Sequence, residues 1–83
     1  MNVPANFNEC LGNAVRAYRK QAGLSQAGLA EKAGLTRRFI QELENGRSDV
    51  SLQTLYRLTA AMEMRVPVFL AGVEELIANG KNT

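Results

Sequence analysis

Two short segments of helical periodicity meet at Gly34, and this junction constrains the fold more than any other feature of the chain. The first segment begins at Ser25 and the second at Thr36, and both residue types are good helix N-caps. The second segment ends at Gly46, a residue type that commonly terminates helices. Residues 25–46 therefore predict two short helices that are joined by a tight turn and packed against each other.

The same periodicity predicts three more helices. Apolar residues recur three and four apart between the remaining glycines, and no segment alternates with the period of a strand. The first helix should carry a capping box between Asn6 and Glu9. The fourth should open after Ser51 and bury Leu52, Leu55, Leu58 and Met62. Residues 1–83 are thus expected to form one all-α domain of five helices, at about 8–21, 26–33, 37–45, 52–62 and 67–79.

Composition excludes several classes of function. The chain of 83 residues has no histidine and a single cysteine, Cys10, for which we expect simple packing in the first helix. Zinc fingers, histidine-assisted nucleophilic catalysis and an internal disulfide are therefore excluded. The longest apolar run, 66–71, is too short to cross a bilayer. We expect a cytoplasmic protein that is not an enzyme, binds no metal, cofactor or membrane, and shows no sign of a small-molecule ligand.

Charge is unevenly distributed along the chain. The net charge is only +2, but residues 16–47 hold seven basic side chains against three acidic ones, whereas the rest of the chain from 48 onward holds three against four. A polyanionic ligand is therefore expected to bind to the first half of the chain.

The predicted helix after Thr36 presents a polar face opposite its buried one. With Ile40 as the buried reference, the exposed side near the helix start carries Arg37, Arg38, Gln41 and Glu42. The arginine fork matches the O6 and N7 atoms of guanine in the DNA major groove. Two arginines on a solvated helix are often ordinary surface residues, but cations at a helix N-terminus oppose the macrodipole, which favours a role in binding an anion. This is the layout of a helix-turn-helix whose second helix enters the major groove.

The motifs together resemble a known family. The segment from Leu11 to Leu70 is similar to the phage repressor and Cro type of helix-turn-helix, the xenobiotic-response-element family of bacterial regulators, and thus to a lambda-repressor-like fold. A single domain of this size with a short terminal helix is similar to restriction-modification controller proteins and to small phage Cro-like repressors. The motifs that carry the resemblance are Arg19-Lys20, Gly23-Leu24-Ser25-Gln26, Leu29-Ala30, Ala33-Gly34-Leu35-Thr36, Ile40 and Leu43-Glu44-Asn45-Gly46.

The resemblance implies roles for individual residues. Gln26 matches the family's glutamine that bonds a DNA phosphate and braces the recognition helix, although an exposed first-turn residue is the alternative. Thr36, Arg37, Arg38 and Glu42 match positions that face the bases in family members. Asn45 and Arg47 match the loop that contacts the DNA backbone. For Arg47, a solvated role is the competing interpretation.

Two further implications concern the scaffold. Arg19 and Glu44 match a largely buried ion pair that ties the first helix to the end of the recognition helix in such repressors. A departure from the family pattern occurs at Glu63, where a helix-ending glycine is usual.

The last predicted helix has a wider apolar face than one small core should need. One helix-turn-helix domain reads only a few base pairs, so sequence specificity usually requires two such domains bound to half-sites one DNA turn apart. We therefore predict a homodimer through this helix, with an interface formed by Phe69, Val73, Leu76 and Ile77. In the alternative, Phe69 and Leu70 complete the core of the monomer.

These observations lead to one functional hypothesis and one rival. The hypothesis is a sequence-specific, double-stranded DNA-binding transcriptional regulator, such as a repressor, that acts as a homodimer on a palindromic operator. Regulation would come from its own concentration, or from competition and contact with RNA polymerase. The rival is an antitoxin or adaptor whose main role is to bind a partner protein, with DNA binding used for autoregulation.

Overall fold

The computed structural model describes residues 3–80, and this part of the chain contains five α-helices and no strand. The prediction of an all-α fold with five helices is confirmed. The helices are α1 (Phe7–Gln21), α2 (Gln26–Ala33), α3 (Arg37–Glu44), α4 (Leu52–Ala61) and α5 (Val66–Gly80). Among the described residues, no helix combines the length and the apolar composition that crossing a bilayer requires.

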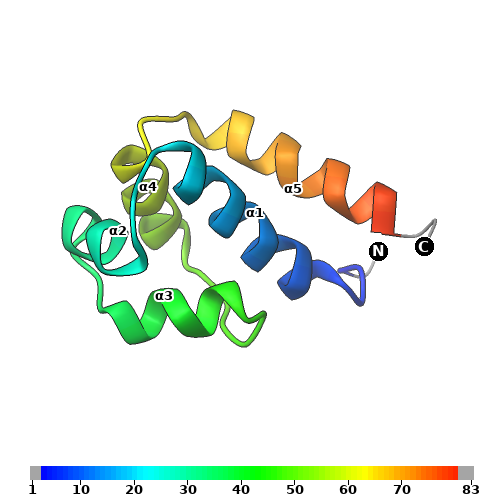
Figure 1. The fold of residues 1–83 in the computed structure, drawn as a ribbon. Helices are drawn as coiled ribbons and strands as arrows, with labels where there is room; N and C mark the ends of the chain where they lie inside the picture. The colour runs from blue at the N-terminus through cyan, green and yellow to red at the C-terminus, as the bar shows by residue number, and fades with distance from the viewer. Residues whose placement is uncertain (1–2, 81–83) are drawn as a thin grey trace.

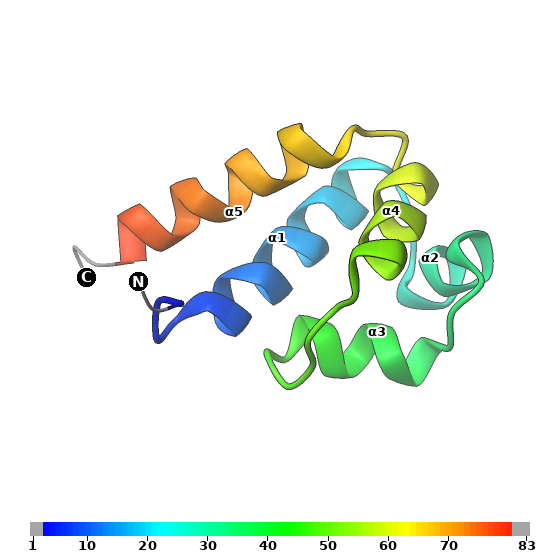
Figure 2. The same ribbon diagram turned by 180° about the vertical axis from the view of Figure 1, so that it is seen from behind.

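Helix α1 lies in the middle of the molecule, with α3 along one side of it and α5 along the other (Figure 1). Helix α2 packs against α3 and α4, and the same order of helices is seen from behind in Figure 2. Since α5 covers the side of α1 that faces away from α3, the outer face of α3 is left uncovered. The turn between α2 and α3 contains Gly34, whose φ of +71° is the left-handed conformation that glycine adopts without strain.

Three of the helices begin with the side-chain caps that their sequences predict. The hydroxyl oxygens of Ser25, Thr36 and Ser51 each accept a backbone N–H three residues later, at 2.9 to 3.0 Å. The predicted capping box at Asn6 is wrong, because the Asn6 side chain makes no cap hydrogen bond. Its ψ of 15° departs from the extended conformation in which an N-cap side chain reaches back to its helix.

The core is built from one apolar face of each helix. The large apolar side chains that are almost fully buried are Leu11, Val15, Leu29, Ile40, Leu43, Leu58, Phe69 and Val73. Cys10 is buried with them, and Phe39 packs against the core from a partly buried position. Leu52, predicted to be buried, is 67% exposed, because it occupies the first position of α4 at the end of the helix rather than over the core.

Helices α1 and α3 approach each other closely at Gly12. A Cβ atom at this position would overlap the carbonyl oxygen of Leu43 and lie 2.8 Å from that of Glu44. Both are backbone atoms at the end of α3, so neither can move without displacing the helix. The glycine therefore allows the last turn of α3 to lie directly on α1.

Replacing Glu63 by glycine should stabilise the fold. Glu63 has a φ of +55° and is the one residue other than glycine with a positive φ within residues 3–80. The backbone N–H groups of Glu63 and of the next residue close α4 with the same pair of hydrogen bonds that a glycine and its following residue donate after α1, α2 and α3. Release of left-handed strain should raise the free energy of unfolding of Glu63→Gly by about 1 kcal/mol, measured by urea denaturation. Glu63→Ala removes the same charge but keeps the strain, so an equal gain in that variant would contradict the explanation.

Candidate nucleic-acid interface

The outer face of α3 carries the polar residues that the sequence places there. Arg37 and Arg38 occupy the first two positions of the helix and are exposed. Gln41 and Glu42 lie half-buried one turn further along. Within residues 3–80, neither Arg37 nor Arg38 forms an ion pair or a side-chain hydrogen bond. Both guanidinium groups are therefore free to bind a ligand that approaches this face.

The residues that flank α3 extend the polar face at both ends. Thr36 is exposed before the helix, and Asn45 and Arg47 are exposed after it. The Thr36 hydroxyl oxygen accepts the N–H of Phe39 at 3.0 Å, so its lone pair caps the helix while its O–H remains a donor. The surface that we call the α3 face thus comprises Thr36, Arg37, Arg38, Gln41, Glu42, Asn45 and Arg47.

The last residue of α3, Glu44, is the centre of a buried polar cluster. Its Oε2 atom accepts a hydrogen bond from Arg19 Nε at 2.6 Å, and its Oε1 atom accepts one from Arg19 Nη2 at 3.1 Å. Arg19 also donates from Nη1 to the carbonyl oxygen of Leu24, at 2.9 Å. This is the ion pair that the resemblance implies, and it ties α1 both to α3 and to the turn before α2.

Arg16 is a second cation beside the Glu44 carboxylate. The sequence predicted no specific role for it and included it only among the seven basic residues of 16–47. Its Nε atom lies 3.5 Å from Glu44 Oε1, and its Nη2 atom donates to the Glu44 carbonyl oxygen at 3.1 Å. The spacing of three residues from Arg19 would have placed Arg16 on the same side of α1. The Arg16 guanidinium thus satisfies a backbone carbonyl at the C-terminus of α3, and its positive charge interacts favourably with the negative end of the helix dipole.

The electrostatic environment keeps Glu44 ionised. Burial by itself would raise the pKa of this carboxyl group, since it disfavours the charged form. Hydrogen bonds from Arg19 and Gln26, together with the charges of Arg19 and Arg16, outweigh burial and lower the pKa below its ordinary value. The Glu44 carboxylate at the C-terminal end of α3 is therefore ionised at neutral pH and only accepts hydrogen bonds.

Gln26 contacts Glu44 from the first position of α2. Its Nε2 atom donates to Glu44 Oε1 at 3.0 Å, and its side chain is half-buried. The structure therefore brings Gln26 to the end of α3, whereas Arg37 and Arg38 lie at the beginning of that helix. The resemblance implied the pair of Arg19 and Glu44, but it did not imply that Gln26 also donates to the Glu44 carboxylate.

The structure corrects the predicted dimer interface on α5. Phe69 and Val73 are buried in the core of the chain itself, at 0% and 1% exposure. They lie on the side of α5 that packs on α1 and α4, so neither can contact a partner. Leu76 and Leu70 are partly open instead, at 36% and 37% exposure, and Ile77 is half-buried.

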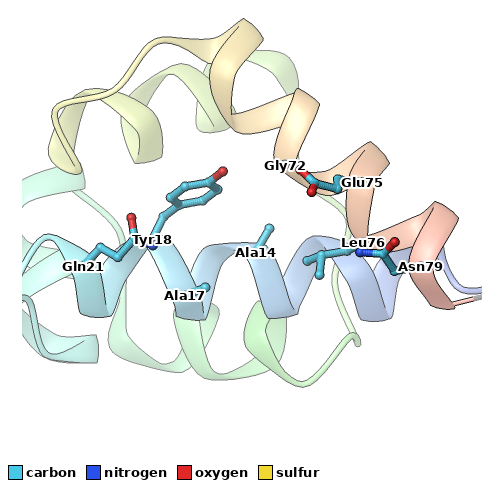
Figure 3. Close-up of a pocket in the computed structure, with 8 residues that line it drawn as sticks. All are labelled: Ala14, Ala17, Tyr18, Gln21, Gly72, Glu75, Leu76 and Asn79. Atoms are coloured by element: carbon cyan, nitrogen blue, oxygen red, sulfur yellow. The ribbon is translucent and has the colours of Figure 1, made fainter. Parts of the chain in front are cut away.

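A groove of about 210 Å³ runs between α1 and α5 (Figure 3). Small residues open it, with Ala14 and Ala17 on α1 and Gly72 on α5. The Tyr18 side chain points from α1 toward α5 (Figure 3), where its ring lies 5.8 Å from that of Phe69. The groove is smaller than the roughly 300–1,000 Å³ of typical small-molecule sites, so we attribute it to the packing of small side chains between the two helices.

Comparison with known proteins identifies a family and several relatives that this chain resembles. Residues 15–68 match the family described as Helix-turn-helix, which spans α2, α3 and α4. The immunity repressor protein of Bacillus phage phi105 is 37% identical over 67 residues, which are 81% of this chain and 46% of the repressor. Control protein C.SmaI of Serratia marcescens is 40% identical over 65 residues, which are 78% of this chain and 77% of that protein. The chain therefore spans less than half of the phage repressor but most of the control protein.

Solved structures share the arrangement of all five helices. The crystal structure of the clp gene regulator ClgR from Corynebacterium glutamicum superimposes with a TM-score of 0.89 at 28% sequence identity. The alignment covers 96% of this chain and 85% of that one. The likeness therefore includes α1 and α5 as well as α2, α3 and α4.

Proposed function

The chain belongs to the helix-turn-helix family of transcriptional regulators, and on this premise we propose that it binds double-stranded DNA sequence-specifically as a homodimer on a palindromic operator. The family relationship agrees with the resemblance drawn from the motifs. The observation that best supports the proposal is the α3 face, where two arginines without an ion pair among residues 3–80 stand exposed at the start of a helix that is itself fixed to the core.

Each polar residue of this surface is assigned a role in the proposal. Arg37 and Arg38 would read base edges in the major groove, with Thr36, Gln41 and Glu42 beside them. Asn45 and Arg47, in the loop after α3, would contact the DNA backbone, as would Gln26 at the start of α2. A helix N-terminus favours an anion, so the position of Gln26 suits a phosphate.

Selection of binding sites from a random duplex pool, followed by salt titration of the winning site, tests this proposal. A dimeric regulator should enrich a two-fold symmetric sequence whose half-sites lie about one DNA turn apart. The logarithm of the affinity should fall with the logarithm of salt concentration, with a slope of about −0.9 for each phosphate that is neutralised. Failure to enrich any sequence would exclude sequence-specific binding. An enriched site without symmetry would exclude the dimer on a palindrome.

The partly exposed leucines of α5 support a dimer contact at a different place from the one first predicted. We assign the contact to Leu70 and Leu76, because the core leaves these side chains open, with the half-buried Ile77 at its edge. Apolar side chains gathered on one helix commonly mark an interaction site.

Leu76→Glu should convert the dimer into a monomer. An unpaired charge at an apolar contact is costly to desolvate, so the dimer dissociation constant should rise by about tenfold or more. Light scattering across a dilution series measures this change, and circular dichroism checks that the helices remain. Leu52→Glu, which changes an exposed leucine on α4, is the matched control and should leave the dimer intact. If Leu70→Glu and Leu76→Glu both remain dimeric, the interface does not involve α5.

The antitoxin or adaptor role remains the second candidate. It shares the helix-turn-helix and differs in having a second protein as its main ligand. A stable complex with a different protein, recovered when the chain is expressed with its neighbouring genes, would favour this alternative over a regulator that acts alone.

A further inference from the structure

The chemistry of the Glu44 carboxylate determines how the Gln26 side chain is oriented. An ionised carboxylate can only accept hydrogen bonds, whereas a glutamine amide has a donor end and an acceptor end. Glu44 Oε1 therefore selects the donor end of Gln26, and the two atoms lie 3.0 Å apart. The reversed amide would place two oxygens against each other, so the carboxylate fixes which end of the amide faces inward.

The bond to Glu44 leaves a second donor on Gln26. The Nε2 atom carries two hydrogens, and Glu44 takes one of them. No other hydrogen bond of the Gln26 side chain is formed within residues 3–80, and the side chain is only half-buried. The remaining N–H can therefore be offered to an acceptor outside the protein.

Two arginines make this arrangement compatible with a nearby anion. A carboxylate would normally repel a phosphate. Here Arg19 holds Glu44 through two hydrogen bonds, and Arg16 lies 3.5 Å from the same oxygen that accepts from Gln26. The cluster therefore has one negative and two positive charges, so its net charge attracts a phosphate while its carboxylate stays in place.

We propose that Glu44 is a positioning residue for DNA binding, which acts by fixing the Gln26 amide so that its second Nε2–H donates to a phosphate oxygen. The inference rests on the proposed function, since it needs DNA as the ligand. It goes further by assigning to Glu44 a role in binding that is separate from its role in the scaffold.

Affinity for the selected duplex should be measured by fluorescence anisotropy at constant salt with the full chain. The set comprises wild type, Gln26→Ala, Glu44→Gln, the double variant and Glu31→Gln. Loss of one hydrogen bond to a charged group should weaken binding by about tenfold in Gln26→Ala, and Glu44→Gln should lose most of the same factor. The double variant should bind about as weakly as Gln26→Ala alone, because both changes remove one contact.

The direction of the effect separates positioning from net charge. Glu44→Gln removes a negative charge, which by long-range electrostatics should strengthen DNA binding. Glu31→Gln removes the same charge from an exposed position on α2 and serves as the matched control, expected to bind as tightly as wild type or slightly more tightly. Circular dichroism at the assay temperature gives the folded fraction, to which each affinity is referred.

The possible failures are distinguishable. If the wild-type chain selects no site and binds no duplex, the proposed function fails. If binding depends on Arg37 and Arg38 while folded Glu44→Gln or Gln26→Ala binds as tightly as wild type, only the positioning role is overturned. The same holds if Glu44→Gln weakens binding equally with and without Gln26, because Glu44 then acts through the fold.

Nuclear magnetic resonance of the wild-type chain gives a second measurement that does not depend on any variant folding. One Nε2 proton of Gln26 should show a hydrogen-bonded shift both in the free protein and in the complex. The other should move when duplex is added. Two Gln26 protons that are unaffected by duplex would overturn the proposal.

Discussion

Replacing Glu44 by leucine is expected to lower the free energy of unfolding by about 3–5 kcal/mol. The substitution leaves Arg19, a residue that is only 8% exposed, without the carboxylate that accepts two of its hydrogen bonds. Arg16 and Gln26 lose a partner at the same time. Urea denaturation followed by circular dichroism measures the change, and Glu31→Leu, on an exposed position of α2, should change it by less than about 0.5 kcal/mol.

Removing both charges should be less harmful than removing one. In Arg19→Met combined with Glu44→Leu, no buried ion is left unpaired, and apolar side chains fill a similar volume. The double variant should therefore be more stable than Glu44→Leu alone, although Arg16 and Gln26 still lose their acceptor. A double variant whose loss equals the sum of the two single losses would show that the pair contributes no coupling energy.

The pH dependence of this contribution follows from the lowered pKa of Glu44. A carboxyl group whose pKa is lower in the folded state stabilises that state fully above its unfolded pKa, about 4.3. The stabilisation is lost as the pH falls from there through the folded pKa. The stability difference between wild type and Glu44→Gln should therefore be constant near neutral pH and shrink below about pH 4. A difference that stays constant into this acidic range would contradict the assignment.

Arg37→Ala and Arg38→Ala are each expected to reduce the preference for the selected site over a scrambled duplex by about 5- to 150-fold. This range corresponds to the roughly 1–3 kcal/mol that a two-pronged arginine contact to guanine contributes to discrimination. Both guanidinium groups are exposed and free of ion pairs within residues 3–80, so removing them should not disturb the fold. Competition binding with the two duplexes at one salt concentration measures the preference.

Other cations provide the comparison for these two arginines. Arg47→Ala should weaken the selected and scrambled duplexes alike and reduce the salt slope by about one unit, as expected for a phosphate contact. Arg65→Ala removes the same charge from the connection before α5 and should alter neither quantity. If Arg37→Ala and Arg38→Ala behave like Arg47→Ala, the arginines of α3 neutralise phosphates rather than read bases.

The fold could be predicted from local signals because those signals act over a few residues. Ser25, Thr36 and Ser51 cap the helices that they were expected to cap. The spacing of Ile40 and Leu43 placed the buried side of α3 correctly, and with it the exposure of Arg37 and Arg38. Asn6 shows the limit of such signals, since its residue type suits a cap but its backbone conformation does not.

The surface of α5 could not be predicted from the sequence. Phe69, Val73, Leu70 and Leu76 are all apolar, and the helical period alone does not say how wide the buried stripe is. The packing of α5 against both α1 and α4 decides that Phe69 and Val73 are covered and that the two leucines remain partly open. The predicted interface was therefore wrong at the two positions nearest the core.

The sequence by itself determined the helices, the turn between α2 and α3, and the polar character of the α3 face, because capping, periodicity and glycine conformation depend on neighbouring residues. Only the tertiary structure decided that Arg16, Arg19 and Gln26 converge on Glu44. These residues come from three helices and lie up to 28 positions apart. Their contact depends on the close approach of α1 to α3 at Gly12, and that approach results from the packing of the whole core.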